Sequence, residues 1–491
     1  MGKDVYTSND QLGGVKVMHT NGVTHVTSKN HLSGIFSIIE WLSFVPAVRR
    51  GPLAIRDISG YEVIERPVEF YPEDKSTQYD PRLLLTGKAD ETTGKWISGF
   101  ADRGSFRETL DGWAKSVVVG RARLGGIPFG VVVTEVRTSE KVVPADPAAP
   151  NTQENLIQQA GQVWFPDSAH KTATAIKDFK GEDLPLFIFA NWRGFSGGQR
   201  DMFDEVLKFG AAIVDGLVNY EQPVFVYIPP FAELRGGAWA VVDPTINEGI
   251  MEMYADPAGR GGVLEPAGLI EIKYRKKQLL EAMHRLDDKI IHLTQRLTGL
   301  SAEEKETEGA QIQRDIKARE DALLPIYVQV ATEFADLHDT PGRMKAKSCI
   351  REIVEWKNAR TFFYWRLKRQ LAEFQLRREV VASSSKNISF AAAEQHLKTW
   401  FTESVNGGRV PRQLNVSVDE LWARSDKDVL LWLASDKEWI KTRITGLSRE
   451  YTANQVVQLG LKDPKAAVAG ILELLHQLSD KDREDALSTL R

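Results

Sequence analysis

One stretch near the middle of the 491-residue chain constrains the fold more than any other. Residues 184–190 form a short, nearly continuous apolar run, which is typical of a strand buried on both faces. A Gly-rich turn follows at residues 191–198, with Ser196 available as a helix cap. From Gln199 the apolar residues keep the 3.6-residue period of a half-buried helix, and residues 224–228 form a second buried strand. The pattern predicts a βαβ crossover with two parallel strands in one sheet.

Two pairs of adjacent glycines stand in the turns of this unit. Gly197 and Gly198 lie where the predicted helix begins, so free backbone N–H groups there point outward. Gly236 and Gly237 follow the second strand by a few residues, and without a Cβ they let a ligand approach the backbone closely. Backbone amides at two adjacent strand ends suit the stabilisation of an oxyanion, and the alternative is two ordinary tight turns. Glycine spacing alone does not decide between these interpretations.

Two pairs of basic residues alternate with apolar neighbours, which places each pair on one face of a predicted strand. Arg121 and Arg123 belong to a predicted hairpin over residues 117–136, where the pattern favours a solvated or salt-bridged face over an anion contact. Lys273 and Arg275 point the same way if their segment is extended. Two cations on one face suit the phosphate groups of a ligand, and a solvated face is the alternative.

Composition excludes several function classes. A net charge of −4 does not predict a nucleic-acid footprint, and the single cysteine, Cys349, excludes internal disulfides and cysteine-based metal sites. The apolar runs are far shorter than the roughly 20 residues that a membrane span needs, and the N-terminus lacks the apolar region of a signal peptide. We therefore expect a soluble, cytoplasmic protein that binds no nucleic acid and has no membrane span.

Common catalytic motifs are absent from the sequence. It contains no Ser–His–Asp, metal-ligand or P-loop pattern, so no metal is expected. His338 is interpreted as a capping or core histidine, because no Ser or Cys motif accompanies it. Any chemistry would then depend on positioning and on backbone amides.

The pattern of breakers and charges predicts three parts with a first boundary near residue 60, inside a Pro-rich connector over residues 51–82. The first part contains a strand-like alternation at residues 22–27 and an amphipathic helix at residues 32–45. A charged, helical hairpin is predicted over about residues 275–330, broken around Gly299. The predicted parts are residues 1–60, residues 61–380, and a tail of weakly amphipathic helices at residues 381–491.

Four segments of the chain resemble the carboxyltransferase domain of eukaryotic, multidomain acetyl-CoA carboxylases. The resemblance runs from about Val5 to at least Trp365 and thins toward the C-terminus. It implies a crotonase-like (ClpP/crotonase) α/β fold, a ββα superhelix with a helical insertion and a helical C-terminal tail. The four segments are residues 120–128, 161–166, 191–198 and 233–237.

The resemblance implies an activity and separate roles for several domains. Such enzymes transfer the carboxyl group from carboxybiotin to acetyl-CoA and form malonyl-CoA, the first committed step of fatty acid synthesis. Biotin sits on a separate carrier domain, and a biotin carboxylase domain binds ATP. Residues 1–60 resemble the end of the N-terminal half of the carboxyltransferase, so we expect a truncated half and an enzyme that is incomplete on its own. Residues 61–380 resemble the C-terminal half, and a homodimer is implied.

The resemblance also implies site residues. Arg193 would hold the carboxylate, while Gly197, Gly198, Gly236 and Gly237 would supply backbone amides. Further residues are implied for the ligands: Lys273 and Arg275 for coenzyme A, and Phe195 and Val206 for the pocket that takes biotin or inhibitors.

Other functions remain open on the residues alone. The chain could be a non-catalytic dimerisation or regulatory fragment, or a carboxyltransferase for another acyl-CoA such as propionyl-CoA. A crotonase-type hydratase or isomerase would need a pair of glutamates near the glycine turns, and Glu205 and Glu233 lie nearby in sequence.

Overall fold

The computed structural model describes residues 6, 8–74, 77–146, 148–149, 151–385, 387–410 and 416–489. The chain divides into two compact units, Met1–Tyr364 and Trp365–Arg491. The predicted boundaries near residues 60 and 380 stay predictions. Among the described helices, none is long and apolar enough to cross a membrane.

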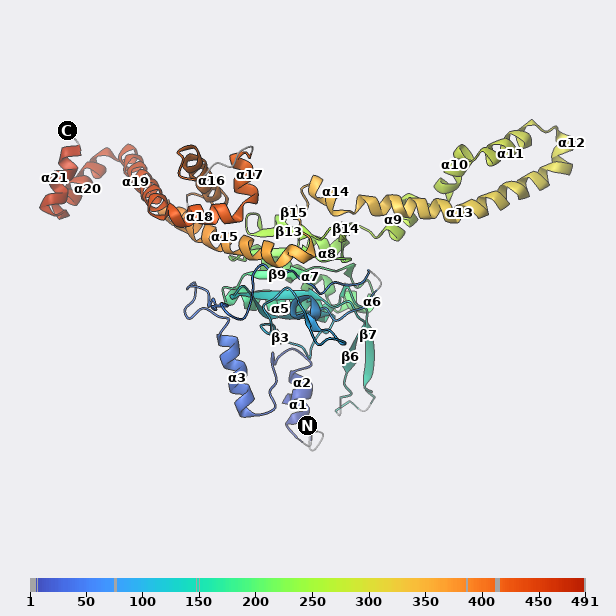
Figure 1. Ribbon diagram of the computed structural model, residues 1–491, viewed down its shortest axis with the longest axis horizontal. Coiled ribbons are helices and arrows are strands. Elements are labelled where there is room, and N and C mark those ends of the chain that lie inside the picture. The colour runs from blue at the N-terminus through green and yellow to red at the C-terminus, as the bar shows by residue number, and fades with distance from the viewer. Residues whose placement is uncertain are drawn as a thin grey trace. The chain divides into compact units, whose positions relative to one another are not determined.

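A seven-stranded sheet forms the centre of the first unit (Figure 1). Its order is β15-β13-β11-β9-β5-β4-β3, and the five strands from β15 to β5 run parallel. Strand β4 pairs antiparallel with both of its neighbours, β5 and β3. The apolar runs seen in the sequence are buried throughout β9 and β11, as expected for parallel strands covered on both faces. The strands are β3 (Arg107–Thr109), β4 (Val117–Leu124), β5 (Ile127–Thr134), β9 (Leu186–Phe189), β11 (Val224–Ile228), β13 (Met251–Ala255) and β15 (Glu352–Ile353).

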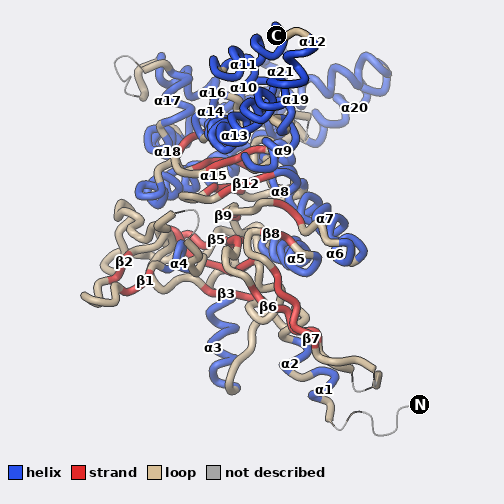
Figure 2. The backbone as a smooth tube through the Cα atoms, turned by 90° about the vertical axis from the view of Figure 1, so that its right-hand side faces the viewer, coloured by secondary structure: helices blue, strands red, loops and turns tan. Residues whose placement is uncertain are grey.

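Helices and aromatic side chains cover the two faces of the sheet. Helices α5 (Pro166–Gly181) and α7 (Val206–Val218) pack against each other beside the strands (Figure 2). On the opposite side, the first turns of α15 (Trp356–Ser383) place the rings of Trp356 and Phe363 against aromatic residues of β9 and β11. Both rings are fully buried, so the sheet lies in a closed three-layer core.

The crossover between β9 and β11 confirms the predicted βαβ unit, with one correction. The helix predicted from Gln199 is divided into α6 (Gln199–Phe203) and α7, because Glu205 adopts a left-handed conformation with φ of 67°. Ser196 is not the cap, since Gly198 occupies the N-cap position of α6.

Short strands and helices complete the sheet domain. The described residues also form four two-stranded sheets, β1–β2, β6–β7, β8–β10 and β12–β14, of which the last two are parallel. The strands are β1 (Lys88–Ala89), β2 (Trp96–Ile97), β6 (Ser139–Val143), β7 (Asn155–Gln159), β8 (Val163–Trp164), β10 (Gly194–Phe195), β12 (Glu233–Arg235) and β14 (Arg260–Gly262). The helices are α4 (Arg82–Thr86), α8 (Gly236–Ala240), η1 (Pro244–Asn247) and α14 (Pro341–Ala346).

A helical insertion follows β14 and confirms the predicted hairpin. The long helix α13 contacts α9, α10 and α11, and the chain leaves α11 at Gly299 (Figure 1). The expectation of an extended segment around Lys273 is wrong, because that residue ends a helix. The helices are α9 (Pro266–Lys273), α10 (Lys276–Leu286), α11 (Asp288–Gly299), α12 (Ala302–Glu304), the π-helical turn η2 (Lys305–Gly309) and α13 (Ala310–His338).

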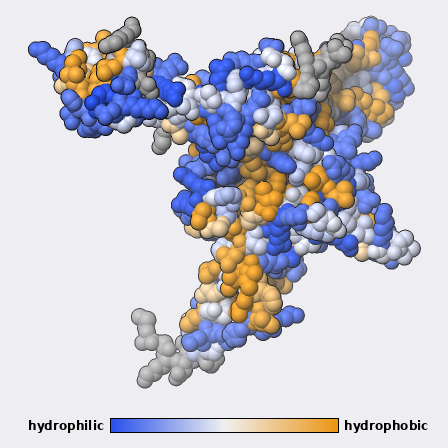
Figure 3. Space-filling model, turned by 60° about the vertical axis from the view of Figure 1, so that its left-hand side comes forward, coloured by the Kyte–Doolittle hydropathy of each residue, from blue (hydrophilic) through white to orange (hydrophobic). Residues whose placement is uncertain are grey.

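Near the N-terminus the described chain forms α1 (Asp10–Gly13), α2 (Val15–Met18) and α3 (His31–Leu42). The predicted strand at residues 22–27 does not form. The predicted amphipathic helix does form, with Asn30 and Ser33 in a capping box, but none of its residues is buried. Apolar side chains gather at the end of the molecule where α1–α3 lie (Figure 3). Those of α3 that are exposed include Leu32, Ile35, Phe36, Ile38, Ile39, Trp41 and Leu42.

The second unit is helical among its described residues, as predicted for the tail. Its core gathers buried aromatic rings, with Phe401 in contact with Trp422 and Trp432. Beyond the end of α15, the helices are α16 (Phe390–Asn406), α17 (Val418–Arg424), α18 (Asp426–Ser435), α19 (Lys437–Lys462), α20 (Pro464–Gln477) and α21 (Asp480–Thr489).

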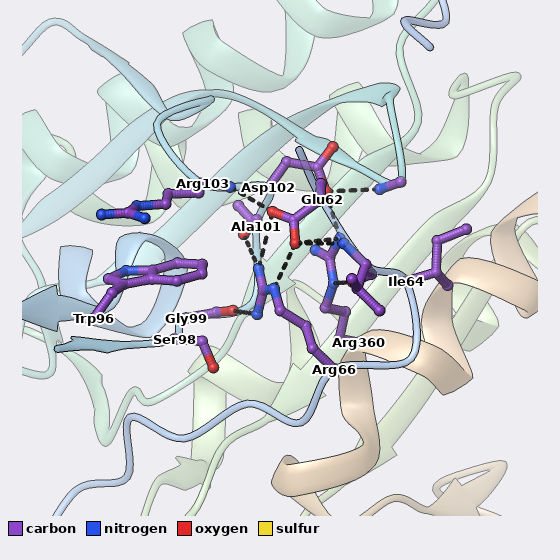
Figure 4. A network of polar contacts seen from close by, with 12 residues as sticks. Glu62, Ile64, Arg66, Trp96, Ser98, Gly99, Ala101, Asp102, Arg103 and Arg360 are labelled. Atoms are coloured by element: carbon purple, nitrogen blue, oxygen red, sulfur yellow. Dashed lines mark hydrogen bonds and ion pairs between the residues drawn. The ribbon is translucent and has the colours of Figure 1, made fainter. Parts of the chain in front are cut away.

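A buried polar network fixes the Pro-rich connector to the sheet (Figure 4). The Arg360 guanidinium is fully buried and donates to Asp102 at 2.6 Å, and it lies 3.6 Å from Glu62. Arg66 donates to Glu62 at 2.6 Å. Burial by itself raises the pKa of Glu62, but hydrogen bonds from Arg66 and Arg103 hold the pKa below its ordinary value. Every charge in this network therefore has a close partner of opposite sign.

Candidate active site

The structure brings the two Gly-Gly turns side by side. Trp192 pairs with Leu234 in a parallel bridge, and the Arg235 N–H donates to the Trp192 carbonyl at 2.9 Å. The bridge aligns the turn after β9 with the turn after β11, although the two are about 40 residues apart in sequence (roughly the length of a βαβ crossover). Two adjacent strand ends thus present glycine backbone in one place, as the oxyanion interpretation requires.

The glycines lie at helix starts, and two of the four, Gly197 and Gly237, have open space beside them. Gly198 is the N-cap of α6, and Gly236 and Gly237 open α8, so their N–H groups lack acceptors within the helix. A Cβ placed on Gly197 would meet no atom within 4 Å, and one on Gly237 would only touch the Phe195 ring at 3.5 Å. Gly236 has φ of 48°, which glycine adopts without strain. The protein therefore leaves room for a ligand at this backbone, and the amide role stays a prediction.

Arg193 belongs to the first of these turns, and its side chain is exposed. Its Nε is 3.3 Å from Oε1 of Glu265, and the two side chains are 45% and 41% exposed. The Arg193 backbone N–H donates to the carbonyl of Gln162 at 2.8 Å, which fixes the backbone. The guanidinium itself has only the exposed Glu265 carboxylate as an ion-pair partner. An exposed pair of this kind is worth about 1 kcal/mol or less, so the guanidinium is available to a ligand.

The two predicted pocket residues have different surroundings. Phe195 is half-buried and stacks on Trp164 with a centroid distance of 5.1 Å. Its ring lies where a Cβ on Gly237 of α8 would touch it at 3.5 Å. Val206 opens α7 and is fully buried. Phe195 therefore faces the paired turns, whereas Val206 supports them from within, and a direct ligand contact for either residue stays a prediction.

Lys273 and Arg275 flank the junction of α9 and α10 rather than sharing a strand face. Both are exposed, and Arg275 lines a cavity of 490 Å³ between α9, α10 and α13 with an apolar floor that includes Ile270 and Leu279. Helix α9 begins directly after Glu265 and is about 12 Å long, so the two cations lie one helix length from Arg193. Contact with coenzyme A stays a prediction for both.

The other basic pair is structural, as the sequence pattern favoured. Arg121 is buried and donates twice to Glu182, at 2.7 and 2.5 Å. Arg123 is buried as well and donates to the carbonyls of Ser43, Ala54 and Gly126. Burial lowers the pKa of Arg123 to about 10, and no ligand anion has access to it.

Sequence reasoning missed Arg235, which lies between the paired strand and Gly236. It is 1% exposed and forms ion pairs with Glu233 and with Asp339, 104 residues away. Burial by itself lowers the pKa of Arg235, but these carboxylates hold it above its ordinary value. The sequence shows an arginine within segment 233–237, but it does not show that Asp339 is its partner, because Asp339 is distant in sequence.

The histidine and the two glutamates considered as catalytic groups are otherwise engaged. His338 is half-buried, and its Nδ1 contacts the Phe334 carbonyl at 2.7 Å. Glu205 pairs with Lys208 on the surface, and Glu233 is buried against Arg235. The described residues contain no group of three or more His, Cys, Asp or Glu that could hold a metal ion.

Comparison with known proteins identifies the family. Residues 1–371 match the model of the carboxyl transferase domain. Over its whole length the chain is 46% identical to acetyl-CoA carboxylase of Schizosaccharomyces pombe, 47% to that of Dictyostelium discoideum and 46% to that of Saccharomyces cerevisiae. The chain spans about a fifth of the length of these relatives, 21% in each case.

A solved structure supports the fold. Transcarboxylase 12S, crystallised with methylmalonyl-coenzyme A and methylmalonic acid, superposes with a TM-score of 0.52 over 74% of this chain and 56% of that one, at 15% identity. This neighbour has a crotonase-like fold, which confirms the predicted fold class. The chain belongs to the carboxyl transferase domain family and is homologous to the carboxyltransferase region of eukaryotic acetyl-CoA carboxylases.

Proposed function

We propose that this chain is the carboxyltransferase part of an acetyl-CoA carboxylase, which transfers a carboxyl group from carboxybiotin to acetyl-CoA and gives malonyl-CoA. The observation that carries the proposal is the pairing of the two Gly-Gly turns beside Arg193 in a chain about 46% identical to such enzymes. Biotin carboxylase and biotin carrier domains, as implied by the resemblance, would supply the carboxybiotin.

The residues at the paired turns fit this chemistry. Carboxybiotin, when bound, supplies the carboxyl group, and its urea nitrogen accepts the proton that leaves the acetyl methyl group. The N–H groups of Gly197, Gly198, Gly236 and Gly237 would donate to the oxygen on which negative charge develops, each worth a few kcal/mol. Arg193 would hold the carboxylate by charge-assisted hydrogen bonds, because its own ion pair is exposed and weak.

Binding of the thioester would use the opposite end of α9. Lys273 and Arg275 are exposed cations there, and diphosphate groups suit two neighbouring positive charges. Phe195 would line the pocket next to the glycine backbone, with Val206 beneath it.

We further propose a homodimer, with the exposed apolar side of α3 as a contact surface. Seven large apolar side chains of one helix are exposed together, and contiguous apolar patches of this size mark interaction sites. A non-catalytic fragment that only dimerises is the second candidate, favoured by the same surface.

The test is carboxyl transfer from malonyl-CoA to free biotin, measured with this chain alone and with an N-terminal carboxyltransferase half taken from a relative. We expect carboxyl transfer in the mixture. The rate of transfer should fall at least tenfold in Gly197→Ala, because the added methyl group meets no protein atom but occupies the space beside the backbone amide. Gly299→Ala at the end of α11 is the matched control, since its methyl group also has free space and should change nothing. A stable dimer without transfer in either sample would refute the enzyme proposal and support the fragment.

A further inference from the structure

The helical insertion is attached to the second glycine turn at both of its ends. It leaves the sheet domain after β14, which pairs in parallel with β12, the strand that leads into Gly236 and Gly237. It returns through α13, which brings the chain back toward β14 and α14 (Figure 1). The residue that follows α13, Asp339, accepts the backbone N–H of Gly261 in β14 at 3.0 Å. The two ends of the insertion therefore meet at the strand pair that leads into the turn.

Asp339 contacts the turn through Arg235, the residue before Gly236. Its carboxylate accepts a hydrogen bond from Arg235 Nη1, and both side chains are buried, with exposed fractions of 11% and 2%. The same guanidinium donates to Glu233 at 3.1 Å and to the Leu264 carbonyl at 3.3 Å. These three contacts fix the orientation of the guanidinium, and the bond to Asp339 is the one that joins β12 to the end of α13.

The backbone of Arg235 belongs to the turn itself. Its N–H donates to the Trp192 carbonyl at 2.9 Å, the bond that aligns the two glycine turns, and Arg235 directly precedes the first turn of α8. Backbone donors stabilise a developing negative charge only when they are held at the right distance from it. A shift of the Arg235 main chain would move the amides of Gly236 and Gly237 as well. The contacts that hold the Arg235 side chain therefore also limit movement of these amides.

A glycine in β14 makes room for the contact between the two charged groups. A Cβ on Gly262 would lie 2.6 Å from Asp339 Oδ1 and 3.1 Å from Arg235 Nη1, so both groups pack directly against the backbone there. Glycine has no Cβ, which is why the carboxylate and the guanidinium can meet across this strand. A larger residue at position 262 would push them apart. The sequence of β14 is thus fitted to this ion pair.

A second ion pair at the same end of α13 provides a comparison. Asp336 lies one helical turn before Asp339 and pairs with Arg260 at 3.0 Å, where each side chain is 27% exposed. In the register of the two strands Arg260 faces Glu233, at the end of β12 away from the turn, whereas Gly262 faces the turn end. The pair of Asp336 therefore joins α13 to β14 without lying at the glycine turn.

We propose that Asp339 is a positioning residue for carboxyl transfer: through Arg235, it holds the backbone of Gly236 and Gly237 where their amides can donate to the developing oxyanion. The inference deepens the proposed function and rests on it for the role of those amides. It gives the end of the helical insertion a part in supporting the active site.

The test compares Asp339→Asn with Asp336→Asn in the mixture of the full chain and an N-terminal carboxyltransferase half, with malonyl-CoA and biotin as substrates. Asp339→Asn keeps the shape of the side chain but removes its charge. The kcat should therefore fall about tenfold while the KM for malonyl-CoA stays within about twofold of the wild type, as for an interaction that acts in the transition state. Asp336→Asn is the matched control and should change both values by less than about twofold. A purely structural role of Asp339 would lower the folded fraction and leave the kcat per folded chain unchanged, which would overturn the proposal.

A double substitution tests whether Asp339 acts through Arg235. Arg235→Gln should lower kcat, and adding Asp339→Asn to it should lower kcat by less than about a further twofold, because the cation on which Asp339 acts is already gone. A full tenfold loss from Asp339→Asn in that background would overturn the route through Arg235. The comparison of Asp339→Asn with Asp336→Asn does not require Arg235→Gln to fold.

Hydrogen–deuterium exchange of the full chain separates this inference from the proposed function. Asp339→Asn should speed exchange several-fold in the peptide that spans residues 233–240, and Asp336→Asn should not. Faster exchange there, in a protein whose wild type transfers no carboxyl group, would refute only the proposed function. Wild-type transfer with unchanged kcat and unchanged exchange in Asp339→Asn would refute only the positioning role. A raised KM with unchanged kcat would also refute it, since Asp339 would then act on thioester binding.

Discussion

Two arginines of the first unit, Arg360 and Arg193, are placed in opposite ways. Arg360 is fully buried and donates to Asp102 and two backbone carbonyls, with Glu62 nearby (Figure 4). Arg193 is 45% exposed and has one carboxylate at 3.3 Å. A buried cation must have all its hydrogen bonds satisfied within the protein, whereas a ligand-binding cation must keep some unmet. The difference separates arginines that hold the fold from one that is available for chemistry.

Removing the buried arginine should give the largest effect. Arg360→Ala leaves Asp102 buried without its cation and leaves Glu62 with Arg66 alone, so the free energy of unfolding should fall by about 3–5 kcal/mol. Urea unfolding of the full chain measures it. The control is Arg50→Ala, which breaks an exposed pair with Glu221 and should cost less than about 1 kcal/mol. An equal fall in the free energy of unfolding in the two variants would contradict the proposed difference between buried and exposed arginines.

Removing the exposed arginine should change function and leave stability almost intact. Arg193→Ala should lower carboxyl transfer about 10- to 100-fold, the value of a charge-assisted hydrogen bond of 1.5–3 kcal/mol. Its unfolding free energy should stay within about 0.5 kcal/mol of the wild type, because the lost ion pair is surface-exposed. Steady-state kinetics and urea unfolding on the same preparation separate the two effects. A loss of stability that matched the loss of activity would place Arg193 with the structural arginines.

A third cation, Lys171, is buried like Arg360 and extends the comparison to pH. Lys171 is 1% exposed and donates to the carbonyls of Trp113 and Ala114, and burial lowers its pKa to about 8. Between pH 8 and the ordinary lysine pKa near 10.5, the unfolded chain binds a proton that the folded chain has released. The free energy of unfolding should therefore rise with pH in this window, by at most about 1.4 kcal/mol per unit.

Urea midpoints measured between pH 8 and 9.5 for the wild type and Lys171→Met check this slope. The variant should lose it, while Lys95→Met, at a position with a 75% exposed side chain, should keep it. An unchanged slope in Lys171→Met would assign the pH dependence to other groups, such as Arg123 at higher pH.

Local sequence patterns predicted helices, strands and turns correctly where interactions between residues close in sequence determine them. The apolar run at β9, the hairpin of β4 and β5, and the break after Gly299 follow from side-chain period and turn residues within about ten positions. The resemblance to a family supplied the fold class and the site residues, which the same patterns leave open.

Tertiary structure decided the rest, because it depends on partners that are far apart in sequence. In the part of the chain that the structure describes, residues 22–27 belong to no strand, and the alternating segment around Lys273 is helical instead, in α9 and α10, which pack on α13. Arg123 and Arg235 became structural through buried contacts with carbonyls and carboxylates as many as 104 residues away, whereas the distant partner of Arg193, Glu265, forms only an exposed ion pair with it. The sequence by itself determined where strands, turns and glycines lie. Only the fold determined which charges are satisfied and which stay exposed, because burial and pairing are properties of the assembled layers.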